Sequence, residues 1–263
     1  MLMLLSPAKR LDETPVPRVK RVSEPEFLDD AETIVRALRR YSAARLAKLM
    51  NVSDEIAREN HQRYRTWERP FEGRSIPPAI FAFRGDVYLG LDAPTLTARD
   101  LTWTNSHLRI LSGLYGMLRP LDLMHPYRLE MGTRISIART ASLHAYWKPR
   151  IIDALRAAHE DAGGRGIVNL ASAEYFKAVD HRALGAPVVT PVFKERRDNG
   201  RLQSMSFFAK KARGAMARWA IDERIRTPEQ LRTYADDRYE FDEEHSTETT
   251  WVFTRAYEPA GAS

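Results

Sequence analysis

The sequence predicts a single domain, residues 1–263, of the α+β or irregular α/β class, in which helices flank a mixed sheet. Short apolar runs typical of buried strands recur along the chain, and amphipathic stretches of helical period lie between them without regular alternation. No repeat of fixed period is present. A chain of 263 residues can bury a sizeable core without dividing, which favours one large domain.

The first half of the chain opens with a strand and continues with helices. Met1–Leu5 is uniformly apolar, which predicts a buried strand, and the Ser6-Pro7 pair after it suits a helix start. Residues 12–25 contain three prolines and many charges, which predicts a surface loop. Amphipathic stretches then predict helices at residues 26–40, 43–50 and 54–67, the last two capped by Ser42 and Ser53.

The second half of the chain mixes strands with helices. Residues 79–83 predict a strand that leads into a glycine-containing turn, and Thr97 with Asp100 forms the capping box of the next helix. Further helices are predicted at residues 143–158 and 209–224, and a short one begins at Ser172. Further strands are predicted at residues 166–170, 188–193, 202–207 and 250–254.

Composition excludes several kinds of protein. The chain has no cysteine, so disulfides, thiolate metal sites and cysteine nucleophiles are excluded. The apolar start lacks a preceding basic region and is too short for a membrane span, which predicts a cytoplasmic protein without a membrane partner. The net charge of +6 favours polyanionic partners, but only 8 of the 41 basic residues are lysines, an arginine skew that coding bias can also produce.

The segment from His107 to Gly132 contains the most informative pattern. A helix-like apolar run ends in the sequence SGLYG at residues 112–116, and arginines follow at Arg119 and Arg128. Two glycines so close together predict a hairpin whose uncovered backbone N–H groups can hold a phosphate. The same residues also suit a glycine helix stop with leucines in the core, so both interpretations are open at this point.

Four segments place a strand end or a turn beside a helix start and a basic side chain, which is how anion sites are usually built. They are residues 6–9, 84–86, 169–177 and 208–213. In the last of these, Lys210 and Arg213 share one helix face beside Gly214, whereas Lys211 lies on a neighbouring face. Ordinary capping with solvated lysines is the more frequent explanation of any one segment taken alone.

Signals of catalysis, metals or cofactors are weak. Asp86 and Glu130, each close to an arginine, could form an acid–base pair or simple salt bridges. Ser6 and Lys9 match the S-x-x-K of serine acyl enzymes, but the companion K-T-G motif is absent. No histidine pair has metal-binding spacing, the acidic turn 242–245 is typical of hydrated surface, and nucleotide-binding fingerprints are missing. The sequence therefore predicts no metal and no cofactor, and it favours a non-enzymatic role without deciding the matter.

Six ordered segments that span almost the whole chain carry a family resemblance: LSPAK (5–9), FRGDVY (83–88), LSGLYGMLRPLDL (111–123), PYRLEMG (126–132), NLASAEYFK (169–177) and KKARG (210–214). Together they closely resemble the peroxide stress resistance protein YaaA family. The chain departs from the family pattern at Arg84, where the family often has lysine, and at residues 148–150. The tail after residue 243 matches weakly.

The resemblance implies a cytosolic protein that protects DNA during peroxide stress and is associated with lowered free intracellular iron. It also implies an α/β fold with a positively charged cleft and a helix-hairpin-helix element that contacts DNA. Matching of the motifs assigns the hairpin to Leu111, Ser112, Gly113, Leu114, Tyr115 and Gly116. It assigns the basic lining of the cleft to Lys9, Arg84, Arg128, Lys210, Lys211 and Arg213.

The leading hypothesis is a DNA-binding stress protein that contacts phosphates independently of base sequence. Arg119 and Lys177 are expected to add to its basic surface, and polar cleft residues are expected at Ser6, Asp86, Glu130, Asn169, Ser172 and Glu174. The alternative is an enzyme whose cleft takes a small anionic or nucleobase-like substrate, with Lys9, Glu130 and the helix start at Ser172 near the reacting group. Direct sequestration of iron by carboxylates and histidines is a third hypothesis.

Overall fold

The computed structural model of the protein describes residues 1–16, 19–69, 71 and 76–257. Within these residues, parallel pairing joins five strands: β1 (Leu2–Leu5), β4 (Leu108–Ser112), β6 (Ile167–Asn169), β7 (Val188–Arg196) and β10 (Thr250–Ala256). Antiparallel pairing adds β5 (Gly116–Leu118), β8 (Leu202–Gln203) and β9 (Glu240–Asp242). The result is one mixed sheet of eight strands in the order β5-β4-β1-β6-β7-β10-β9, with β8 attached to β7.

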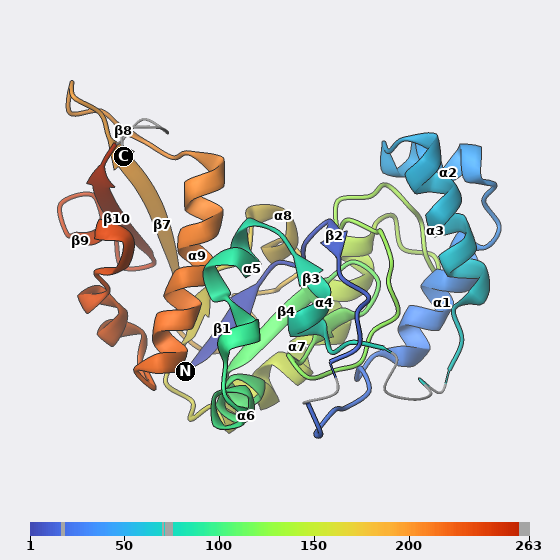
Figure 1. The fold of residues 1–263 in the computed structure, drawn as a ribbon, viewed down its shortest axis with the longest axis horizontal. Helices are drawn as coiled ribbons and strands as arrows, with labels where there is room; N and C mark the ends of the chain where they lie inside the picture. The colour runs from blue at the N-terminus through green and yellow to red at the C-terminus, as the bar shows by residue number, and fades with distance from the viewer. Residues whose placement is uncertain (17–18, 70, 72–75, 258–263) are drawn as a thin grey trace.

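Helices surround this sheet, so the expected mixed sheet flanked by helices is confirmed (Figure 1). The longer helices are α1 (Leu28–Leu38), α2 (Ala43–Met50), α3 (Asp54–Thr66), α6 (Ala98–His107), α7 (Leu143–Asp161) and α9 (Ser206–Asp222). In Figure 1, α1, α2 and α3 lie together at one end of the molecule, and β9 and β10 lie at the other.

Short elements connect the longer ones. They are the helices α4 (Ala79–Ala82), α5 (Asp86–Leu91) and α8 (Ala173–Phe176) and the 3₁₀ turns η1 (Ala93–Thr95), η2 (Pro228–Thr233) and η3 (Asp236–Arg238). Outside the main sheet, β2 (Arg10–Leu11) pairs with β3 (Phe83–Arg84) in a two-stranded antiparallel ribbon. No helix in the described part of the chain is long and apolar enough to cross a bilayer.

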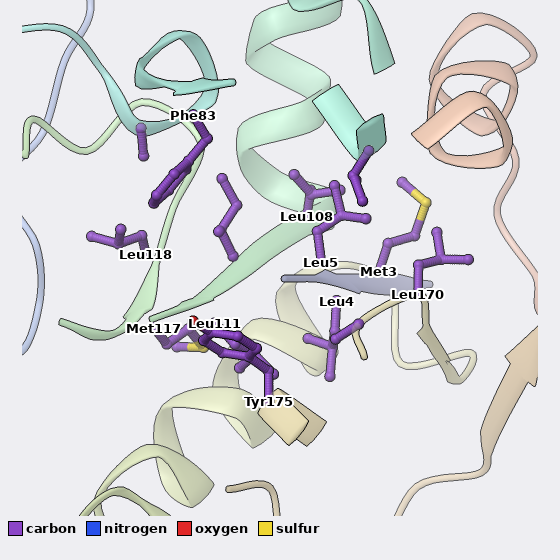
Figure 2. Close-up of a cluster of buried hydrophobic side chains, with 14 of the residues drawn as sticks. Met3, Leu4, Leu5, Phe83, Leu108, Leu111, Met117, Leu118, Leu170 and Tyr175 are labelled. Carbon is purple, nitrogen blue, oxygen red and sulfur yellow. The ribbon is translucent and has the colours of Figure 1, made fainter. Parts of the chain in front are cut away.

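The central strand β1 contributes to the core on both faces of the sheet. Figure 2 shows Leu4 on the same side as Leu111, whereas Met3 and Leu5 point to the side that holds Leu108. All five side chains are fully buried. Because successive strand side chains point to opposite faces, a strand covered on both faces has a continuous apolar sequence, as Met1–Leu5 does.

Local capping signals in the sequence correspond to real hydrogen bonds. The Ser42 and Ser53 side chains accept the N–H groups of Arg45 and Ile56 at 3.3 Å each. Thr97 and Asp100 form the complete capping box of α6. These predicted helix starts are therefore confirmed; of the predicted loop 12–25, residues 17 and 18 lie outside the described residues.

Two predicted strands are wrong. Residues 79–82 form helix α4, because its first N–H groups find partners elsewhere in the chain: Ala79 donates to the Asp122 carbonyl at 2.8 Å. The strand predicted at 202–207 ends at residue 203, and α9 begins at residue 206. There the Met205 N–H donates to the buried Glu195 carboxylate at 3.2 Å, which turns the chain out of the strand.

Two glycines allow α5 and α9 to pack backbone against backbone. An ideal Cβ placed on Gly90 would lie 2.1 Å from the Lys211 carbonyl oxygen, and one placed on Gly214 would lie 1.7 Å from the Val87 carbonyl oxygen. Both distances are far inside van der Waals contact, so only glycine fits at either position. This close approach sets the position of Arg213, the neighbour of Gly214, relative to α5.

Candidate functional site

The connections between parallel strands diverge at the centre of the sheet. The strands β1 and β6 are neighbours at the centre of the sheet. The next parallel strand after β1 in the chain is β4, which lies on the side of β1 away from β6. The next one after β6 is β7, which lies on the side of β6 away from β1. Ligands of open parallel sheets bind outside the carboxyl ends of strands at such a switch point. A cavity of about 590 Å³ lies there, lined in part by the residues that follow β1 and β6. Its volume falls within the range of roughly 300–1,000 Å³ seen for small-molecule sites.

Five segments far apart in the sequence line this cavity, which we call the central cavity. They lie within residues 6–10, 84–87, 127–130, 170–175 and 210–213. Among the described residues, the cationic lining side chains are Lys9, Arg10, Arg84, Arg128, Lys210 and Arg213, and the anionic ones are Asp86, Glu130 and Glu174. The excess of positive over negative groups favours an anionic occupant.

Hydrogen bonds between polar side chains join the ends of β1 and β6. The Ser6 hydroxyl accepts the Ser172 N–H at 2.8 Å and donates to the Ser172 hydroxyl at 3.3 Å. The Asn169 side chain accepts the Ala171 N–H at 3.1 Å, and the Tyr88 hydroxyl donates to the Ser6 carbonyl at 3.0 Å. Ser6 and Ser172 therefore form a fixed part of the cavity wall, whereas Asn169 shapes the chain behind it.

Glu130 binds two cations of the cavity wall through one oxygen. Its Oε1 lies 3.1 Å from Lys9 Nζ and 3.0 Å from Arg128 Nη2. The buried Tyr64 of α3 donates its hydroxyl to the Arg128 carbonyl at 2.5 Å, which ties this wall to the helices at one end of the molecule. Of the two roles considered for Glu130, the salt bridge is the one observed.

Two further carboxylates hold cations at the cavity. Asp12 Oδ2 accepts both Nε and Nη2 of Arg84, at 3.1 and 2.7 Å. Hydrogen bonds from Thr14 and from Arg84 lower the pKa of Asp12 to about 2, so its carboxylate stays ionised at neutral pH. Lys210 Nζ of helix α9 lies 4.0 Å from Asp86 Oδ2 of helix α5.

Arg213 differs from these cations. Arg213 lines the central cavity, and within the part of the chain that the structure describes no hydrogen bond or ion pair joins its guanidinium to another side chain or to a carbonyl. Burial lowers the pKa of Arg213, and no carboxylate among the described residues opposes the shift.

The hairpin residues 111–116 lie in the interior rather than at the cavity. They form the end of β4 and the turn into β5, and all six are buried. An ideal Cβ on Gly113 would lie 2.3 Å from the Leu129 carbonyl oxygen, and one on Gly116 would lie 2.5 Å from the Trp147 ring. The predicted exposure of this hairpin is therefore wrong, because other segments cover both glycines. Its leucines belong to the core, Leu111 in strand β4 and Leu114 in the turn, rather than in a helix.

The structure brings together only some of the predicted site residues. Those that line the central cavity are Ser6, Lys9, Arg84, Asp86, Arg128, Glu130, Ser172, Glu174, Lys210 and Arg213. Lys177 and Lys211 are exposed outside the cavity lining, and Asn169 is buried behind it. Arg119 also lies outside the lining, because its guanidinium bonds to Asp122 at 2.9 Å and to the Glu24 carbonyl at 2.7 Å.

Three polar lining residues were not predicted from the sequence: Arg10, Tyr127 and Tyr175. Burial raises the pKa of both tyrosines, so each keeps its hydroxyl proton at neutral pH. Both lie inside motifs that carry the family resemblance, PYRLEMG and NLASAEYFK, but an aromatic residue in such a segment is more often core. Arg10 had no local signal, since its place depends on pairing with residue 84.

The acidic turn 242–245 does not form a metal cluster. His245 Nδ1 lies 2.8 Å from Asp242 Oδ1, and Arg196 donates to Asp242 Oδ2 at 2.9 Å. Among the described residues, no group of three or more histidine, aspartate or glutamate side chains is arranged to hold a metal ion. The turn 242–245 therefore does not support the hypothesis of direct iron sequestration.

The fold and the cavity define a protein with a mixed sheet flanked by helices and a charged, ligand-sized cavity at a switch point of that sheet. Residues 1–245 match the family described as peroxide stress protein YaaA, and the chain belongs to this family. The family name supports a role in the peroxide stress response.

Similar proteins match almost end to end. A UPF0246 protein of Paraburkholderia phytofirmans is 48% identical over 257 residues, which cover 97% of this chain and 98% of the relative. A UPF0246 protein of Chromobacterium violaceum is 48% identical over 255 residues, with 97% and 99% covered. One of Burkholderia mallei is 49% identical over 257 residues, with 97% and 98% covered.

Proposed function

We propose that the protein acts in the peroxide stress response by binding a small anionic molecule in the central cavity. The observation that carries this proposal is the convergence of five distant segments, with their excess of cations, on one cavity at the switch point of the sheet. Tyr127, Leu129, Leu170 and Tyr175 add apolar surface to the lining. A mixture of charged and apolar lining is typical of sites for organic ligands.

The arrangement of charges supports a specific ligand over a general attraction to anions. Lys9 and Arg128 pair with Glu130, and Arg84 pairs with Asp12, so these ion pairs orient the three cations before a ligand arrives. Preorganised groups lose less entropy on binding, which increases affinity for a ligand of matching shape. Carboxylates in the same cavity also supply proton acceptors, so we extend the proposal to an enzyme that acts on this ligand.

A ligand screen tests this proposal. We expect a nucleotide, sugar phosphate, nucleobase or small carboxylate to raise the melting temperature, since a ligand at 100 times its Kd adds about 2.7 kcal/mol to stability. Lys9→Ala should raise the Kd for that ligand about tenfold or more, because it removes a cavity cation and leaves Glu130 with one partner. Lys48→Ala, at an exposed lysine of α2, is the matched control and should respond as wild type. No response from any compound would reject the proposal.

Sequence-independent DNA binding is the second candidate. Its supporting observation is that Lys9 and Lys210 are 66% and 53% exposed at the cavity, with the exposed Lys211 next along α9. The backbone of residues 111–116 takes no part, since it is buried.

If DNA is the ligand, duplex affinity should fall steeply between roughly 50 and 200 mM salt, because each phosphate that the protein neutralises releases counterions. Replacing Lys210 and Lys211 with alanine should then reduce the slope of log K against log salt by about 0.9 for each phosphate that is no longer neutralised. Filter binding or fluorescence anisotropy measures the slope, with the exposed Arg99→Ala as control. Affinity that is independent of salt would exclude this candidate.

A further inference from the structure

The cations of the central cavity differ in how their charge is compensated. Lys9 and Arg128 share Glu130, Arg84 pairs with Asp12, and Lys210 lies near Asp86. Arg10 has no such partner among the described residues, but it is exposed, so water solvates its charge. Arg213 is half-buried, and it has no partner among the described residues.

A guanidinium in this situation costs free energy. Taking a charge out of water is unfavourable unless an opposite charge or hydrogen-bond acceptors replace the water. Arginine cannot escape this cost by losing its proton, since a guanidinium is not deprotonated in proteins. The charge of Arg213 therefore persists in the unliganded protein, and no side chain or carbonyl of the described residues pairs with it.

The position of Arg213 is fixed by the packing of its helix. Gly214, the next residue, lies against the Val87 carbonyl, and Gly90 lies against the Lys211 carbonyl. Because backbone contacts on both sides hold α9 against α5, the helix cannot rotate to move Arg213 out to solvent. The carboxylates that line the same cavity bind elsewhere: Glu130 to Lys9 and Arg128, and Glu174 to the Gly132 N–H at 2.9 Å.

We propose that Arg213 is the residue that holds the terminal oxyanion of the ligand, a phosphate monoester or a carboxylate, inside the central cavity. The planar guanidinium forms two parallel hydrogen bonds with either group, and the incoming charge replaces the water that burial removed. This assignment rests on the proposed small-anion function and names the part of the ligand that the site recognises. A terminal group fits better than the internal phosphodiester of a polymer, since Arg213 lies within a cavity rather than on an open surface.

The test compares wild type with Arg213→Met and Arg213→Lys, using inorganic phosphate and acetate as probes. The unliganded Arg213→Met protein should melt at a higher temperature than wild type, because a methionine of similar length removes the uncompensated charge and keeps the packing. At least one probe should stabilise wild type, and Arg213→Met should raise the Kd for it by about tenfold or more, the loss expected for one charged hydrogen-bonding group. The Kd of Arg213→Lys for the probe should lie between those of wild type and Arg213→Met, since lysine keeps the charge and loses the two parallel hydrogen bonds.

Arg99→Met is the matched control, because Arg99 is an exposed arginine of α6 outside the cavity. It should leave both the melting temperature and the probe affinity near wild type. A lower melting temperature for unliganded Arg213→Met, or an unchanged probe affinity, overturns the assignment. If Arg213→Met weakens binding of an oligonucleotide without terminal phosphate and spares the small probes, the assignment to a terminal group is also overturned.

The outcome separates this assignment from the proposed function. Probes that stabilise all variants equally reject the role of Arg213 and leave small-anion binding intact. If neither the probes nor the ligand screen stabilises wild type, both proposals are rejected.

Discussion

Gly214→Ala should lower the melting temperature of the protein by roughly 10 °C. An ideal Cβ at this position lies 1.7 Å from the Val87 carbonyl oxygen, so α5 and α9 must move apart to accept the methyl group. Overpacking of this kind costs about 3 kcal/mol or more when rigid backbone is the obstacle, and each kcal/mol shifts the melting temperature of a protein of this size by about 2–4 °C.

Helix propensity acts in the opposite direction. If the clash were weak, propensity would decide whether Gly214→Ala raises or lowers the stability of the protein. Alanine is favoured over glycine inside a helix by about 1 kcal/mol, so a harmless Gly214→Ala would stabilise the protein. Thermal and urea unfolding therefore give a clear answer, with Lys211→Ala, at an exposed position of the same helix, as control. An unchanged or higher melting temperature for Gly214→Ala would contradict the backbone contact. Because Arg213 moves with α9, the variant should also weaken binding in the cavity.

Gly116→Ala should destabilise the protein by about 3 kcal/mol, from two causes that add. Gly116 has a φ of +68°, which costs a non-glycine residue about 1 kcal/mol of strain. Its Cβ would also lie 2.5 Å from the Trp147 ring, which is fully buried and can yield little, so overpacking adds about 1–3 kcal/mol.

Gly200→Ala is the matched control, because Gly200 has a φ of +78° and a Cβ there meets no atom of the described residues within 4 Å. It carries the strain without the clash, so the difference between the two variants isolates the contact with Trp147. Urea unfolding gives both values. A hairpin that grips DNA predicts the reverse pattern, in which Gly116→Ala keeps its stability and loses DNA affinity; that result would restore the exposed-hairpin interpretation.

Local signals in the sequence predicted much of the fold and part of the lining of the central cavity. The apolar run of β1 and the serine caps of α2 and α3 depend on residues adjacent in the chain, so sequence patterns are sufficient to find them. Cavity residues such as Ser6 and Lys210 were found for the same reason, since strand ends and helix starts beside basic side chains are local features.

Features that depend on distant partners could not be predicted in this way. Two neighbouring glycines suit both an exposed turn and a close contact, and only the positions of Leu129 and Trp147 decide between them. Helix α4 depends on the Asp122 carbonyl, and Arg10 reaches the cavity by pairing with residue 84. The switch point itself follows from the order of strands in the sheet, which no single segment encodes.

The central cavity takes its walls from residue 6 through residue 213, so it exists only while nearly the whole chain is folded. Occupancy then opposes every opening that separates these segments, because the ligand binds the native state and not the unfolded chain. Proteases in the cell degrade the opened form, and its population falls as ligand accumulates. If the proposed anion occupies the cavity, the lifetime of the protein in the cell should therefore lengthen with the supply of that anion.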